Sequence, residues 1–302
     1  MDGPVRLYGT DAGKAGTPEL RFLNAGDRYL LIEFGTHISI RLNLMALQLG
    51  KRIDRASIPG VVETLPMFVS LLVHYDSTGL APSALIEAVR RLWEGMGSVD
   101  DLEWPSRLIE MPVCYLDPWT RACVDDYCQK IKPIEYNPDF VVRVNGLTDT
   151  KQLVRLHSGT QHWVGGVGFW PGLPDLIPLD PRCVLSVPKY DPPRLWTVPG
   201  AIGVGGGFTS IYPLNTPGGY RLIGRTPVGI YDLSQRYAPF RDSVVLFRPG
   251  DRVKFVPISV EEFEDLDRRW TEGTYVYNIV EYEVFSLRRY ETWVAGVGRG
   301  RF

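Results

Sequence analysis

Cysteine and histidine are scarce in this chain, and neither is spaced for metal binding. Its 302 residues include four cysteines and four histidines. No two cysteines form a C-x-x-C pair, and His157 and His162 are five positions apart, which does not match the i, i+4 pairing of a helical metal site. We therefore expect reduced, structural thiols and no metal site.

Long hydrophobic runs, a secretory signal and an excess of basic charge are also lacking. No apolar run approaches the length of a membrane span, and the first residues do not show the basic and then apolar pattern of an export signal. The 33 basic and 35 acidic residues give a formal charge of -2, unlike a typical nucleic-acid binder. We expect a cytoplasmic protein that contacts neither membrane nor nucleic acid.

Several short catalytic and cofactor-binding motifs are missing as well. The chain has no G-x-S-x-G nucleophile elbow, and its glycine-rich stretch lacks the G-K-[ST] ending of a P-loop. No methionine stands beside a lysine, so the signature of a biotin acceptor is absent. We therefore expect no cofactor on this chain, and any biotin must arrive on another polypeptide.

The first hundred residues alternate between strand-like and helix-like patterns. Residues 27–35 are predicted to form a strand, 39–53 a helix of mixed spacing, and 62–74 two short strands that meet near Pro66. From Pro82 onward, apolar residues recur every three or four positions, which predicts an amphipathic helix with the proline in its first turn. The alternation predicts a small α/β sandwich with helices on one face.

The rest of the chain has the pattern of a mainly-β domain. Residues 97–104 are acidic and rich in turn residues, which marks a linker. After His157, short apolar runs are broken by glycine or proline, as in a closed β structure. Other elements are expected as a strand over 109–115, helices over 125–131, 150–156 (capped by Thr148 or Asp149) and 260–269, and a strand over 274–285. The expected domains are an N-terminal extension at 1–19, an α+β domain at 20–100 and a β-barrel domain with a C-terminal extension at 105–302.

One stretch of the chain is dense in glycine and turn residues. It runs from Gly203 to Pro213 and continues from Pro217 to Pro227. Glycine lets a backbone adopt positive φ or approach another group closely, so this density suggests main-chain amides presented to a ligand. A set of tight barrel turns explains the same pattern. The residues alone leave both interpretations open.

This stretch closely resembles the allophanate hydrolase subunit 1 family, also described as carboxyltransferase subdomains C and D. The resemblance rests on Gly206-Gly207, Ile211-Tyr212-Pro213 and Pro217–Pro227, and upstream on Pro59–Pro66 and Ser70–Asp76. It extends from about residue 20 to about residue 283. The family includes the carboxyltransferase region of urea carboxylase, one of the subunits of 5-oxoprolinase and the Kip kinase inhibitor.

The resemblance implies a fold, partners and cofactors. The fold would be a ferredoxin-like α/β sandwich followed by a mainly-β, cyclophilin-like barrel. The chain would supply half of a carboxyltransferase module and be inactive alone, with a companion subunit 2-like half or large carboxylase subunits on other chains. The complex would use ATP and bicarbonate, with biotin only on a partner, to act on a small molecule such as a urea, an amide or a ketone.

Several features favour the urea-carboxylase-like branch of this family. The segments that resemble urea carboxylase are 117–121, 179–182, 188–194, 217–220 and 272–275. Lys189 stands where many shorter relatives have an arginine, and Phe208 where they have a glutamine. Phenylalanine cannot make the hydrogen bonds of glutamine, so Phe208 either packs in the core or lines an apolar site, as in a ketone carboxylase of the acetophenone kind.

Four residues are candidates for catalysis of carboxyl transfer. The reaction needs a base and fixed donors for a developing oxyanion. Arg194 and Arg225 offer planar guanidinium forks for a carboxylate or phosphate. His157 could act as a base near neutral pH, and Tyr212 could polarise a carbonyl. For each of the four, an ordinary packing or loop-tying role explains the same residue.

Eight further residues are candidates for substrate binding. Glu63 could pair with a cation across the two domains, and an ordinary surface carboxylate is the alternative. The others lie in or beside the glycine-rich stretch: Lys189, Gly206, Gly207, Phe208, Thr209, Gly218 and Gly219.

Two other functions remain open from the sequence. One is a subunit of an ATP-dependent amidohydrolase such as 5-oxoprolinase, which Lys189 and Phe208 weaken. The other is a Kip-type inhibitor that docks on a histidine kinase and performs no chemistry. The segment between Leu116 and Asn145 and the tail after Pro257 favour the carboxylase relatives over this inhibitor.

Overall fold

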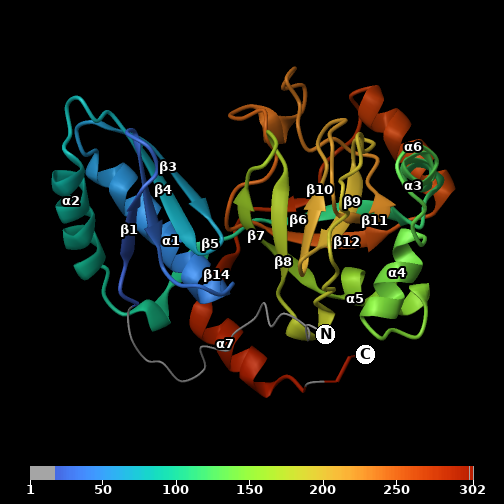
Figure 1. Ribbon diagram of the computed structural model, residues 1–302, viewed down its shortest axis with the longest axis horizontal. Coiled ribbons are helices and arrows are strands. Elements are labelled where there is room, and N and C mark those ends of the chain that lie inside the picture. The colour runs from blue at the N-terminus through green and yellow to red at the C-terminus, as the bar shows by residue number, and fades with distance from the viewer. Residues whose placement is uncertain (1–17, 299, 302) are drawn as a thin grey trace. The chain divides into compact units, whose positions relative to one another are not determined.

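The chain forms two compact units, drawn in Figure 1. The structure, a computed structural model, describes residues 18–298, 300 and 301, so most of the expected extension at 1–19 lies outside the described residues. The first unit contains the described residues up to Pro105 together with Val284–Val297, and the second contains Ser106–Glu283 and the described residues from Gly298 onward. The assignment of Val284–Val297 to the first unit differs from the expected domain at 105–302, which took the whole C-terminal segment into the barrel domain.

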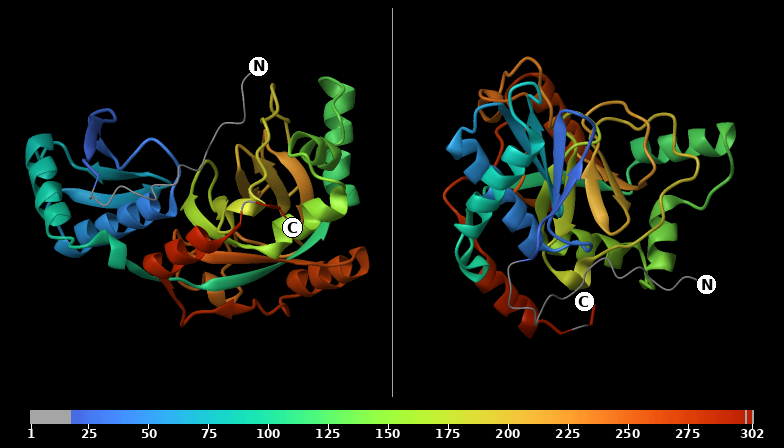
Figure 2. Two further views of the ribbon diagram at one scale, coloured as in Figure 1. Left: turned by 90° about the horizontal axis from the view of Figure 1, so that it is seen from below. Right: turned by 60° about the vertical axis from the view of Figure 1, so that its left-hand side comes forward.

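The first unit is a four-stranded antiparallel sheet with two long helices. Its strands are β1 (Arg21–Asn24), β2 (Tyr29–Glu33), β3 (Val61–Met67) and β4 (Ser70–Tyr75), in the order β1-β2-β4-β3. Its helices are α1 (Ile40–Ala56) and α2 (Pro82–Glu94), and Figure 2 shows α1 running along the sheet. Alternate residues of β2 and β4 are buried, because one face of the sheet is covered. This confirms an α+β first unit. The ferredoxin-like description stays a prediction, since the edge strand β1 precedes β2 in the chain instead of following α2.

A return of the chain completes this unit. The strand β14 (Val284–Ser286) pairs with β5 (Glu103–Pro105), and α7 (Leu287–Gly296) follows it. Arg41 of α1 forms ion pairs with Asp100 and with Glu291 of α7. The expected strand over 274–285 is therefore two short strands, of which only the second belongs here. No pattern in the sequence predicted α7.

Seven strands of the second unit close into a barrel. The order is β11-β9-β10-β8-β7-β12-β6, and β11 pairs back onto β6, while β13 (Ile279–Val280) is added beside β6. The barrel strands are β6 (Leu108–Tyr115), β7 (Gln161–Val167), β8 (Pro174–Pro178), β9 (Ala201–Gly205), β10 (Phe208–Ile211), β11 (Arg221–Arg225) and β12 (Arg252–Pro257). The expectation of a closed, mainly-β second domain is confirmed.

Four helices accompany the barrel. They are α3 (Pro118–Lys130), α4 (Asn137–Val144), α5 (Thr150–Gly159) and α6 (Val260–Thr271). Asp149 caps α5 by accepting a hydrogen bond from the backbone of Gln152, as its position predicted. The helix α3 begins seven residues before the expected 125–131, because Asp117 caps it and Pro118 occupies its first turn. No helix of the described residues is long and apolar enough to cross a bilayer.

The alternation of β10 decides which of its side chains can reach a ligand. Ile211 belongs to the main barrel core, and the Thr209 hydroxyl bonds to the buried His157. Ser210, between them, points the other way and lines a pocket. The strand that carries the glycine-rich stretch therefore forms one wall of a cavity.

Candidate functional site

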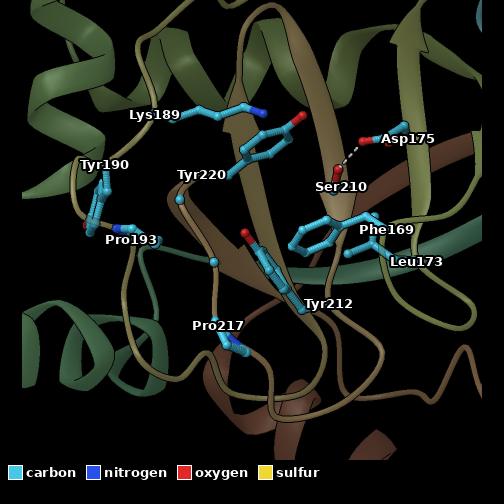
Figure 3. Close-up of a pocket in the computed structure, with 12 residues that line it drawn as sticks. Phe169, Leu173, Asp175, Lys189, Tyr190, Pro193, Ser210, Tyr212, Pro217 and Tyr220 are labelled. Atoms are coloured by element: carbon cyan, nitrogen blue, oxygen red, sulfur yellow. Dashed lines mark hydrogen bonds between the residues drawn. The ribbon is translucent and has the colours of Figure 1, made fainter.

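A cavity of about 360 Å³ lies in the second unit (Figure 3). Its walls come from the turn between β7 and β8, from β8 and β10, from a loop before β9 and from the part of the glycine-rich stretch that precedes β11. The lining residues are Phe169, Leu173, Asp175, Lys189, Tyr190, Pro193, Ser210, Tyr212, Pro217, Gly218, Gly219 and Tyr220. Lys189, Tyr212, Gly218 and Gly219 were candidates from the sequence, so the structure brings four of the predicted residues together.

The glycines between Gly203 and Gly207 shape this cavity. Gly206 and Gly207 have φ angles of 59° and 88° and form the tight turn between β9 and β10, which is the turn interpretation of the pattern. Gly203 and Gly205 instead make room, because a Cβ atom at either would lie 2.8 Å or 2.5 Å from Tyr220. The absence of side chains there seats the Tyr220 ring against the strand.

Gly218, in the second part of the glycine-rich stretch, joins two loops behind the cavity. A Cβ atom at Gly218 would lie 2.5 Å from the hydroxyl oxygen of Tyr212, so only glycine lets this tyrosine reach the wall. The backbones of Gly218 and Arg194 exchange two hydrogen bonds, of 2.9 Å and 3.2 Å. These contacts tie the loop before β9 to the turn before β11.

Arg194 stands directly behind the wall. Its side chain is 1% exposed, and its guanidinium donates to the carbonyl of Tyr220 at 2.6 Å and to the hydroxyl of Thr197 at 3.1 Å. Nη2 also lies 3.5 Å from the hydroxyl oxygen of Tyr212, and Nε has no hydrogen-bond partner among the described residues. Burial raises the pKa of Tyr212, and the charge of Arg194 opposes that rise. The structure thus pairs two of the four predicted catalytic residues.

Asp175 and Ser210 form the acidic side of the cavity. Asp175 is 8% exposed, and its carboxylate accepts a hydrogen bond of 2.6 Å from the Ser210 hydroxyl, drawn as a dashed line in Figure 3. Burial raises the pKa of Asp175, while this hydrogen bond and the charge of Lys189 act against the rise. The Lys189 ammonium lies 5.1 Å from the centre of the Tyr220 ring. The site therefore offers an acceptor, an ammonium donor and tyrosine hydroxyls in one apolar cavity.

Sequence reasoning missed Asp175, Ser210, Tyr190 and Phe169 as site residues. One signal was available, because Asp175 is a carboxylate inside an otherwise apolar strand, and such a residue needs a partner or a function. Phe169 and Tyr190 carry no comparable signal, because their place at the cavity follows from the path of two loops.

His157 lies in the barrel core and does not line the cavity. Its Nδ1 is 2.7 Å from the hydroxyl oxygen of Tyr115, its Nε2 is 3.0 Å from that of Thr209, and its ring stacks on Phe255. Burial lowers the pKa of His157 to about 3, so the ring is neutral near pH 7. The structure places both His157 and Thr209 on the opposite side of β10 from Ser210.

Two other predicted residues of the second unit, Arg225 and Phe208, do not line the cavity, and Glu63 belongs to the first unit. Arg225 donates to the carbonyl of Pro199 at 2.9 Å and lies over the ring of Trp119. Glu63 lies on β3 of the first unit, with its carboxylate oxygen 3.3 Å from Nδ1 of His74 on the neighbouring strand. Phe208 is half-buried at the start of β10 and is not part of the wall. Among the described residues, no group of three or more histidine, cysteine or acidic side chains could hold a metal ion.

Comparison with known proteins matches residues 20–240 to the family described as the carboxyltransferase domain, subdomain C and D. The urea amidolyase of Saccharomyces cerevisiae is 30% identical over 283 residues, which are 92% of this chain and 15% of that protein. A subunit of the 5-oxoprolinase of Bacillus subtilis is 30% identical over 248 residues, which are 79% of this chain and 92% of that protein.

A solved structure shows the same relationship in three dimensions. The Kluyveromyces lactis urea amidolyase superposes with a TM-score of 0.85 and 27% identity, over 92% of this chain and 17% of that one. The chain therefore spans under a fifth of the urea amidolyases that it matches. These matches confirm the resemblance found in the sequence.

Proposed function

Since the chain belongs to the carboxyltransferase subdomain C and D family, we propose that it is a carboxyltransferase-type subunit of a multi-subunit, ATP-dependent carboxylase. The observation that carries the proposal is the cavity built on the family's glycine-rich stretch. This cavity places a hydrogen-bond acceptor, the Asp175 carboxylate, in the same space as the Lys189 ammonium and the hydroxyl of Tyr212.

These groups match what carboxyl transfer requires. The substrate must lose a proton, for which the Asp175 carboxylate is the available base, and the carboxyl carbon passes through a state with negative charge on oxygen before its bond to the carboxyl donor breaks. Lys189 and the Tyr212 hydroxyl, with Arg194 behind it, are positioned to stabilise that charge. Arg194 acts on the substrate only through Tyr212 and is a positioning residue.

The rest of the reaction belongs to other polypeptides in this proposal. Urea amidolyase carries a region like this chain in a much longer protein, and the matched 5-oxoprolinase chain is by name one subunit of an enzyme. ATP and bicarbonate would be used by partner subunits in the cytoplasm, which would deliver the carboxyl group as carboxybiotin or carboxyphosphate. The isolated chain would be inactive.

Mild affinity purification of the chain from its native cells tests this proposal. Mass spectrometry of the eluate is expected to identify large co-purifying subunits, and an avidin blot reports whether one of them carries biotin. The purified complex should incorporate labelled bicarbonate into an acceptor in the presence of ATP, and the isolated chain should not. Recovery of the chain alone, or a sensor kinase as its partner, would contradict the proposal.

A second candidate function is a subunit of an ATP-dependent amidohydrolase. It is favoured by the match to 92% of the length of the 5-oxoprolinase subunit from Bacillus subtilis. The same purified complex distinguishes the two functions, because an amidohydrolase would open 5-oxoproline with ATP and would incorporate no labelled bicarbonate.

A further inference from the structure

We propose that the molecule bound in this cavity carries an apolar ring and an amide-type N–H group, and is neither a small urea nor a simple ketone. This inference rests on the proposed function, since it names the class of carboxyl acceptor. It depends on three properties of the cavity: its volume, its apolar mouth and its single buried carboxylate.

The volume is that of a ring-sized ligand. The cavity measures about 360 Å³, within the range of roughly 300–1,000 Å³ that holds drug-sized molecules. One water has a share of about 30 Å³ in the liquid, and urea, with four heavy atoms to water's one, still fills only a small part of the cavity. A urea molecule would therefore leave most of the cavity to be filled by solvent against apolar walls.

The mouth of the cavity exposes apolar surface. Phe169 lies on the turn between β7 and β8, is 76% exposed and has a φ angle of 66°, in the left-handed region that a bulky residue rarely adopts. A backbone held in this conformation presents the ring at the cavity and does not let it fold into the core. Leu173 and Pro217 continue the same apolar surface. An apolar ring on the ligand would remove this surface from water.

The buried carboxylate selects a hydrogen-bond donor. Oδ1 of Asp175 accepts a hydrogen bond from the Ser210 hydroxyl, and no hydrogen bond to Oδ2 is found among the described residues. An amide N–H in the ligand would satisfy that oxygen, whereas a ketone has no N–H and would leave it unpaired. The ligand carbonyl would then face Lys189 or Tyr212, which are donors.

Titration calorimetry with the full chain tests the ligand class. The probes are phenylacetamide, which has both a ring and an N–H, urea, which lacks the ring, and acetophenone, which lacks the N–H. Phenylacetamide is expected to bind at least about tenfold more tightly than either of the others. Its affinity should fall as the pH is lowered through the pKa of Asp175, because protonation removes the acceptor.

Two pairs of variants locate the binding. Phe169→Ala should weaken the binding of phenylacetamide about tenfold and leave the binding of urea unchanged. The control Leu233→Ala truncates a side chain that is 74% exposed on another loop, and it should change neither affinity. Asp175→Asn should weaken the binding of phenylacetamide and remove the pH dependence of that binding. The control Asp242→Asn, at an exposed position outside the cavity, should change neither. Melting curves of all four variants report whether each is folded.

Three results would overturn the inference. They are equal affinity for urea and phenylacetamide, equal affinity for acetophenone, or no binding of any of the three probes. None of them bears on whether the chain co-purifies with carboxylase subunits and labelled bicarbonate is incorporated, so failure here is distinguishable from failure of the proposed function.

Discussion

At the scale of single residues, Tyr212 connects a buried cation to the cavity. Its hydroxyl lies 3.5 Å from the Arg194 guanidinium, and its ring forms part of the wall. Such a hydroxyl can donate to a developing oxyanion while the charge behind it favours the negative state. In the proposed reaction this residue would therefore influence catalysis more than folding.

We predict that Tyr212→Phe lowers kcat of the purified complex about a hundredfold, the usual effect of losing one oxyanion donor. Stability should fall by only about 1 kcal/mol, because one weak hydrogen bond is lost. Steady-state kinetics and denaturation of the variant measure the two effects. Tyr282→Phe, at a tyrosine that is 87% exposed, is the control. An unchanged kcat in Tyr212→Phe would remove Tyr212 from the mechanism.

His157 shows how burial changes the use of a residue type. Its folded-state pKa is about 3, below the ordinary value of 6.5, because burial penalises the charged ring. Below pH 6.5 this histidine therefore binds a proton in the unfolded chain, whereas in the folded chain it stays neutral down to about pH 3. The contribution of His157 to the free energy of unfolding is therefore fully present above pH 6.5 and is lost as the pH falls toward 3.

We predict that the unfolding free energy falls by up to about 1.4 kcal/mol per pH unit for this histidine between those limits. In His157→Gln, which can still bond to Tyr115 and Thr209, the decline between pH 6 and pH 4 should be less steep by that amount. Urea denaturation across this pH range measures it. Parallel profiles for the variant and the parent would contradict the assignment of a buried neutral ring.

At the scale of elements, the hairpin of β9 and β10 depends on glycine for two separate reasons. Gly206 and Gly207 supply positive φ in the turn, while Gly203 and Gly205 leave space for the Tyr220 ring. The first reason is visible in the sequence, because paired glycines between short β runs predict a tight turn. The second depends on which residue packs against the strand.

We predict that Gly205→Ala destabilises the protein by about 1–3 kcal/mol, the usual cost of forcing extra volume into a packed site. The added Cβ atom would stand 2.5 Å from Tyr220, so that ring must move and the cavity must change shape. Denaturation measures the first effect, and phenylacetamide binding the second. Gly296→Ala, where the added atom meets nothing within 4 Å, serves as the control and should be close to neutral. Equal stabilities of the two variants would show that Tyr220 is not held as described.

At the scale of the whole molecule, the end of the chain stabilises its beginning. Phe285 and Leu287 are buried in the first unit, and the backbone N–H of Leu287 donates to the carbonyl of Leu102 at 3.0 Å. Arg41 holds α7 through Glu291. The first unit is therefore incomplete without residues that follow the barrel.

We predict that a chain ending at Glu283 loses protection mainly in the first unit. Hydrogen exchange should become faster in peptides of α1 and β5, because their β14 and α7 partners are gone. Peptides of the barrel strands should exchange as in the full chain. Uniformly faster exchange, or no change, would contradict the division into these two units.

Local signals in the sequence determined much of this protein. The capping residue Asp149, the proline at the start of α2 and the paired glycines at the β9–β10 turn act within a few residues of chain, so their effects are readable without the fold. The resemblance of the glycine-rich stretch indicated the family for the same reason, since it lies in one continuous segment.

Only the tertiary structure decided the composition of the site. Asp175, Lys189 and Tyr212 come from separate segments, and they meet because the barrel closes and two loops fold over one of its walls. Closure also placed His157 inside the core and Ser210 at the cavity, although Ser210 is the next residue in the chain after Thr209, the partner of His157. Such contacts join residues far apart in the chain, and their geometry depends on packing that no local pattern records.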